Sequence, residues 1–137
     1  MKLLDFIVAE DIRHEMGNKH SIIGVYNETI GLQTKNNDTW PIPFRFGIFI
    51  RLKTDGQDET ANKFTLHVVY DNNNIATMTG DLIPDKTPTT ISLPLVLSTF
   101  PLPGYGEITF NFEIFNDEKS LYSDSQALEI VGPNPEN

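Results

Sequence analysis

The chain has 137 residues, carries 19 acidic against 10 basic side chains, and contains no cysteine. This length is typical of one domain that folds without disulfides, and the lack of cysteine excludes thiolate metal sites. The formal net charge of −9 repels nucleic-acid phosphates and anionic membranes, so neither is expected as a partner. A basic protein or a divalent cation would complement this charge, although it can also serve only to keep the chain soluble.

The start of the sequence lacks the apolar run of a signal peptide, because Asp5 directly follows Leu3 and Leu4. Further along, no run approaches the roughly 18 apolar residues that are needed to cross a bilayer. We therefore expect a cytoplasmic protein.

The most specific local pattern is a pair of β-favouring runs on either side of Gly17 and Asn18. Gly-Asn between two such runs predicts a β-hairpin with a two-residue turn. In that register Glu15 lies opposite His20, and each further pair lies one residue farther from the turn on both strands. The length of the turn therefore decides which side chains share a face of the hairpin. The same register places Ile23 on the apolar side, which is the expected core face.

Glu10 stands out because this register places it on the same apolar side, with Val8. A buried carboxylate must be paired or hydrogen-bonded, or its pKa must rise, and a β-bulge that turns Glu10 outward is the structural alternative. The strand pattern does not require the dense set Glu10, Asp11, Arg13 and His14, since Thr or Val would pair as well there. These four residues are therefore a candidate binding surface. The competing interpretation is that the charges only discourage edge-to-edge pairing.

Alternation with a period of two continues to the end of the chain, and no window shows a sustained helical period. Further strands are expected at residues 44–52, 64–70, 75–83, 91–97, 108–114 and 128–131, with turns at residues 71–74 and 116–119. Pro94 lacks a backbone donor, which assigns its strand to the edge of a sheet. Four side chains are expected to be almost fully buried: Phe46, Ile48, Phe110 and Phe112.

About eight strands separated by turns predict an antiparallel β-sandwich, immunoglobulin-like or of Greek-key type, with a barrel as the alternative. No linker or repeat divides the sequence. We expect a single domain over residues 1–132 and a flexible tail over residues 133–137.

The segments Val8-Ala-Glu-Asp-Ile-Arg-His-Glu and Leu102-Pro-Gly-Tyr-Gly-Glu-Ile-Thr-Phe are less generic than the rest of the sequence. The first contains Ala-Glu-Asp-x-Arg, which strand composition alone does not demand. The two segments resemble the N-terminal and closing hairpins of an uncharacterised family of small bacterial all-β proteins. This resemblance implies a compact β-sandwich, and it implies no reaction, because the family has none assigned.

Catalytic motifs are missing from the sequence. No nucleophile elbow surrounds a serine, no thiol is present, and no glycine-rich loop opens a helix to hold a phosphate. We therefore expect neither an enzyme nor a bound cofactor.

Metal-binding patterns are weak. His14 and His20 flank the first turn near several carboxylates, but surface strands often carry such residues, so no metal site is assigned there. Asp55, Asp58 and Glu59, or the turn at residues 71–74, are the alternatives for calcium. Neither shows the ligand order of an EF-hand, so ordinary turn chemistry is the simpler interpretation.

Trp40, beside Pro41, is the only tryptophan and the last candidate binding residue. Its ring could stack on a sugar or anchor an interface, or it could close one end of the core. Edge strands and loop ends are the parts that such a fold offers to partners. We therefore expect a protein-binding or self-associating module, with a loop-end module for calcium or carbohydrate as the alternative.

Overall fold

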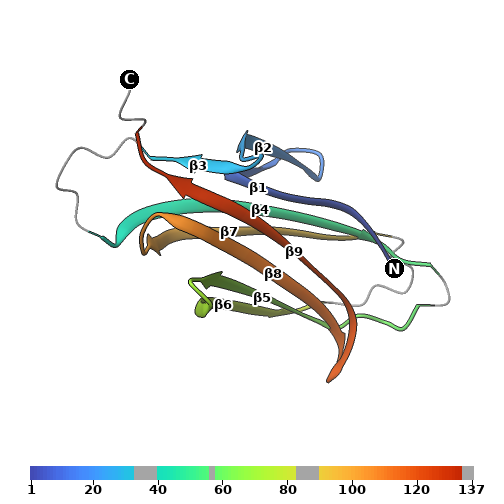
Figure 1. Cartoon of the computed structure of the whole chain (residues 1–137). Helices are drawn as coiled ribbons and strands as arrows, with labels where there is room; N and C mark the ends of the chain where they lie inside the picture. The colour runs from blue at the N-terminus through green and yellow to red at the C-terminus, as the bar shows by residue number, and fades with distance from the viewer. Residues whose placement is uncertain (33–39, 56–57, 83–89, 134–137) are drawn as a thin grey trace.

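The computed structural model describes residues 1–32, 40–55, 58–82 and 90–133, and these ranges form strands and no helix (Figure 1). The strands are β1 (Lys2–Glu15), β2 (Lys19–Val25), β3 (Thr29–Gly31), β4 (Ile42–Lys53), β5 (Lys63–Tyr70), β6 (Asn73–Asp81), β7 (Thr90–Leu102), β8 (Gly106–Asn116) and β9 (Lys119–Val131). Within those ranges no helix is present that could cross a membrane. The expected tail lies outside the described residues except for Pro133.

The strands form two sheets (Figure 1). The first has four strands in the order β2-β1-β4-β7, and the second has five in the order β3-β9-β8-β5-β6. All neighbouring strands are antiparallel except β3, which runs parallel to β9. The all-β prediction is confirmed, and the described part of the chain has nine strands where about eight were expected.

One hydrophobic core receives side chains from both sheets. Alternation turns Phe46 and Ile48 of β4 inward, and it turns Phe110 and Phe112 of β8 toward them; all four are buried, as predicted. The rings of Phe46 and Phe110 meet edge to face, with centroids 5.2 Å apart. Phe6 of β1 meets Phe112 in the same way at 5.0 Å, so aromatic contacts join the two sheets at two places.

The turns after β5 and β8 form where the sequence placed them. Asp71 and Asn72 connect β5 to β6 with φ values of 50° and 61°, and Asp117 in the turn after β8 has a φ of 52°. Asn and Asp tolerate this left-handed conformation better than other residues with a side chain. Pro94 lies in β7, which is an edge strand, and this confirms the inference from its missing donor.

The first hairpin forms, but the prediction of its turn is wrong. The loop has three residues, 16–18, so His14 lies opposite His20, where a two-residue turn would have placed Glu15. Side chains alternate along a strand, so a shift of one residue moves all of β2 to the other face. Ile23, expected on the core side, is therefore exposed.

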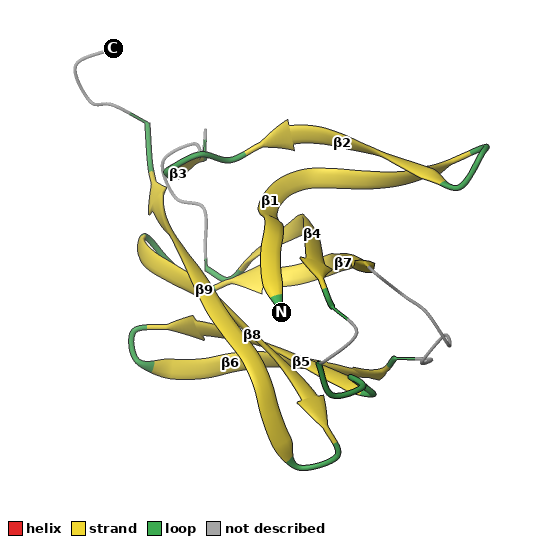
Figure 2. Ribbon diagram, turned by 90° about the vertical axis from the view of Figure 1, so that its right-hand side faces the viewer, coloured by secondary structure: helices red, strands yellow, loops and turns green. Residues whose placement is uncertain are grey.

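β1 bends sharply after Ala9, the last residue that it pairs with β4. Residues 10–25, called the hairpin arm from here on, then lie on the outer side of the first sheet, away from the second sheet (Figure 2). At the crossing, a β-carbon at Gly47 would stand 2.8 Å from Ile12 Cγ1 and 3.0 Å from its backbone nitrogen. Glycine therefore permits this close approach. The bend also leaves Glu10 exposed, so Glu10 is not a buried carboxylate.

Candidate functional site

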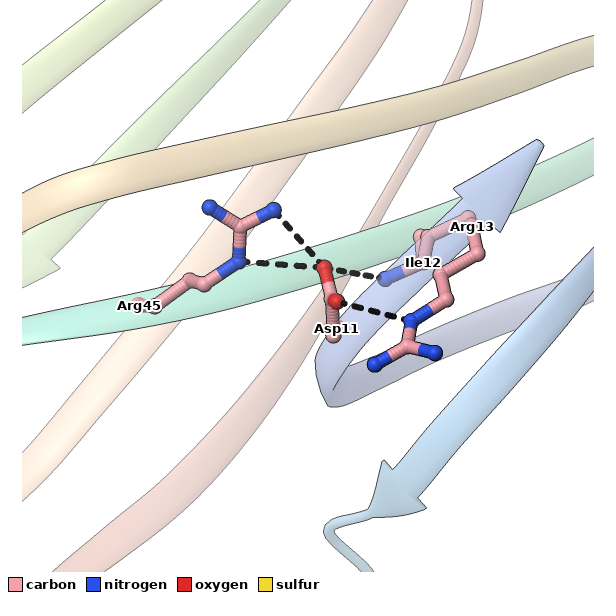
Figure 3. Close-up of polar contacts among 4 residues, drawn as sticks. All are labelled: Asp11, Ile12, Arg13 and Arg45. Carbon is pink, nitrogen blue, oxygen red and sulfur yellow. Dashed lines mark hydrogen bonds and ion pairs between the residues drawn. The ribbon is translucent and has the colours of Figure 1, made fainter.

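Asp11 anchors the hairpin arm to the sheet beneath it (Figure 3). Its Oδ1 accepts hydrogen bonds from Nε and Nη2 of Arg45 on β4, at 3.0 and 2.8 Å, and from the backbone nitrogen of Ile12 at 2.9 Å. Its Oδ2 lies 3.6 Å from Nε of Arg13. Two guanidinium groups therefore flank one carboxylate. These ion pairs give Asp11 and Arg13 a structural role, which is the alternative to a role in binding.

The charges around Asp11 favour its ionised form. The hydrogen bonds from Arg45 are the main reason that the pKa of Asp11 lies below its ordinary value of 3.8, and the backbone bond from Ile12 acts in the same direction. Alternation along β4 puts Arg45 on the face opposite Phe46, and the register between β1 and β4 brings it to Asp11. We therefore assign Asp11 to holding the arm in place.

His14 and His20 form a pair across the hairpin arm. Nδ1 of His14 lies 3.2 Å from Nε2 of His20, and the ring centroids are 5.0 Å apart. The ring of His20 also packs against Phe49 of β4, at 5.8 Å between centroids. Phe49 points away from the core, and the arm gives it a partner there. Sequence analysis singled out His14 but missed its contact with His20, because the length of the turn decides which residue of β2 lies opposite His14.

Glu10 occupies a notch in the arm. Gly24 has a φ of +68°, and a β-carbon there would stand 2.6 Å from Cδ of Glu10. Burial, and to a smaller extent the negative charge of Glu10, raises the pKa of the Tyr26 phenol to about 12. No ion pair of Glu10 occurs among the residues that the structure describes. Its carboxylate is therefore available at the surface.

One of the two edges of the first sheet belongs to the same arm. β2 is the terminal strand of that sheet, and it pairs only with β1 within the described ranges. Ile23 and Val25 on this strand are 37% and 51% exposed. An exposed apolar edge strand is a template on which another strand can pair. The arm thus combines an open backbone edge, apolar side chains and the carboxylate of Glu10.

Trp40 lies elsewhere in the molecule. Its half-buried ring packs against the core and meets Tyr105 edge to face, with centroids 4.9 Å apart. This contact supports the interpretation that Trp40 closes one end of the core. The structure therefore does not bring Trp40 together with the other four candidate residues.

A cleft of about 480 Å³ lies near Tyr105, at the ends of the strands. Its lining combines two tyrosines with polar and acidic side chains: Val69, Tyr70, Asp71, Asn72, Tyr105, Gly106, Glu107 and Thr109. The hydroxyl of Tyr70 donates a hydrogen bond to the carbonyl oxygen of Tyr105, which ties the two walls together. Sequence analysis missed this cleft, because its walls come from two segments that lie far apart in the chain, residues 69–72 and 105–109.

The loop carboxylates considered for calcium are already engaged. Asp58 accepts hydrogen bonds from the backbone of Asp55 and from the amino group of Met1, and Glu59 forms an ion pair with Lys119. Throughout the described part of the chain, no three His, Asp or Glu side chains converge in a way that could hold a metal ion. The proposed calcium ligands therefore gain no support from the geometry.

No protein-family model matches this chain, and no curated protein matches it. The resemblance to a bacterial all-β family stays a prediction. Function must therefore be inferred from the surface of the molecule itself.

Proposed function

We propose that this protein is a non-enzymatic binding module whose hairpin arm captures an extended, basic segment of a partner protein by strand addition to β2. The single observation that supports this proposal most is the open edge of β2 with Ile23 and Val25 exposed on it. In strand addition, backbone hydrogen bonds supply affinity and alternate side chains supply specificity.

The charge of the chain favours a basic partner over a second copy. Two molecules that each carry a net charge of −9 repel each other, whereas a lysine- or arginine-rich segment is attracted. Glu10 lies over Gly24, directly beside the edge on which the segment would pair. Because Gly24 has no side chain, the side chain of Glu10 lies across β2, where a partner's basic side chain can meet its carboxylate.

We also infer that the sheets form an immunoglobulin-like sandwich. If β1, β4 and β7 correspond to strands A, B and E of that fold, and β5, β8 and β9 to C, F and G, the order within both sheets agrees. The hairpin arm is then an addition to the standard fold. Additions of this kind on a rigid scaffold are common places for binding surfaces.

A peptide-binding experiment tests the proposed function. The probe is a fluorescent peptide of about eight residues that alternates lysine and valine, and the readout is fluorescence polarisation. We expect the peptide to bind, and we expect Ile23→Lys or Val25→Lys to weaken binding at least about tenfold. A peptide that alternates glutamate and valine should not bind.

Ile75→Lys is the matched control. Ile75 is also 37% exposed and lies on β6, an edge strand of the other sheet, so this variant adds the same charge at a comparable position. An equal loss from Ile75→Lys, or equal binding of the acidic peptide, would contradict the proposal. So would a dimer of the protein alone that Ile23→Lys dissociates, because the occupant of the edge would then be a second copy.

The cleft at the strand ends supports a second candidate function, the binding of a carbohydrate. Tyr105 is 46% exposed beside the acidic side chains of Asp71 and Glu107, and aromatic rings with hydrogen-bonding groups are what sugars require. Titration of neutral oligosaccharides, followed by chemical shifts of the residues around the cleft, tests this function separately from the arm.

A further inference from the structure

We infer that His14 and His20 form a two-imidazole site for a borderline divalent ion such as Zn²⁺, Cu²⁺ or Ni²⁺ on the hairpin arm. The two residues lie directly opposite each other on β1 and β2, and their nearest ring nitrogens are 3.2 Å apart. This site is independent of the proposed peptide-binding function, since it uses side chains on the face of the arm rather than the edge of β2.

The distance between the nitrogens fits chelation. Two nitrogens that each lie 2.0–2.1 Å from one tetrahedral zinc ion are about 3.3 Å apart. A metal ion can thus replace the hydrogen bond between the two rings without a change in the separation of the strands. Nδ1 of His14 and Nε2 of His20 are already the nearest atoms of the two rings, so chelation requires both rings to turn until their lone pairs point at one ion.

Neighbouring side chains hold the pair without competing for it. His20 is half-buried and packs against Phe49, which fixes one ring, whereas His14 is exposed and free to adjust. The flanking pairs are Arg13 with Ser21 and Glu15 with Lys19. Their side chains lie on the opposite face of the hairpin, because directions alternate along a strand. No positive charge on the arm therefore points at the metal position.

The chemistry of the donors selects the ion. Imidazole suits zinc, copper and nickel, whereas calcium and magnesium prefer oxygen ligands. With no third His, Asp or Glu converging on the site in the described ranges, water or a partner's side chain completes the coordination. Acid should release the ion, because imidazole binds metal only in its neutral form.

Calorimetric titration of the untagged protein with Zn²⁺ alone tests this inference. We expect one ion per chain, and we expect His14→Gln and His20→Phe each to weaken binding at least about tenfold, because each leaves a single imidazole. His20→Phe keeps a ring against Phe49 and so preserves the packing of the arm. Ca²⁺ should give no heat at this site.

His67→Gln is the matched control. His67 lies on β5, where its ring bonds to Thr77 and has no second imidazole beside it, so this variant should bind Zn²⁺ like the wild type. Equal weakening by His67→Gln, unchanged binding in both arm variants, or no Zn²⁺ binding by the wild type would each overturn the inference. Peptide binding by the arm is measured without metal, so the two proposals fail independently.

Discussion

Ile12 packs its side chain directly against Gly47, where even a methyl group would come within 2.8 Å of Ile12 Cγ1. This contact lets the hairpin arm cross the outer face of β4, and Asp11 and His20 then find Arg45 and Phe49 beneath them. Contacts at Gly47, Arg45 and Phe49 therefore hold the arm on β4. A substitution at Gly47 alone should shift it.

Gly47→Ala should destabilise the protein by about 1–3 kcal/mol, because the backbone of the arm lies over this position and must shift. Urea unfolding measures the loss. The control is Gly31→Ala, since a β-carbon at Gly31 meets nothing within 4 Å. If the two variants were equally stable, the arm would not be packed on β4.

Asp11→Asn should make the stability of the protein less sensitive to acid. The pKa of Asp11 is lower in the folded protein than its ordinary value of 3.8, so its contribution to stability is complete above that value. The contribution is lost as the pH falls through the lowered pKa. The variant should therefore be less stable than the wild type at about pH 6 and should approach it at about pH 2.

Denaturant unfolding at both pH values measures this difference. Asp81→Asn is a suitable control, because Asp81 is exposed and forms no ion pair within the described ranges. A deficit of Asp11→Asn that is the same at both pH values would show that its charge does not stabilise the fold.

Tyr26 should make the fold sensitive to alkali. Its pKa is raised from 10.0 to about 12, so between these values the unfolded chain ionises first and stability falls as the pH rises. Glu10→Gln should lower the pKa of Tyr26, although burial will keep it above 10.0. Carbon-13 NMR of the tyrosine rings reports this titration residue by residue, and an unchanged pKa in Glu10→Gln would show that the charge of Glu10 does not act on Tyr26.

Phe110→Ala should destabilise the protein by about 3–5 kcal/mol, because it leaves a cavity where the ring meets Phe46. Thermal and urea unfolding measure the loss. A loss of less than about 1 kcal/mol would mean that this face of β8 does not form the core.

The core and most hairpins were predictable because they depend on short-range patterns. Alternation alone identified the inward faces of β4 and β8, and the missing donor of Pro94 identified an edge strand. Both signals are read within one strand, without knowledge of the partner strand.

The candidate site was predictable only in part. The charges of Glu10 and Asp11 stood out in the sequence, but the length of the first turn decided the faces, and three residues replaced the expected two. Arg45 and Phe49 became part of the site through the bend of β1 after Ala9, which carries the arm over Gly47 of β4 and depends on contacts between distant segments. Local propensity does not encode contacts of this kind.

Amide hydrogen exchange tests the central claim most directly, because it locates the edge that a partner covers. On addition of the lysine–valine peptide, we expect slower exchange in β2 and unchanged exchange in β6, an edge strand of the other sheet. Protection confined to β6 or to the cleft around Tyr105, with β2 unchanged, would contradict the assignment of the hairpin arm as the binding surface.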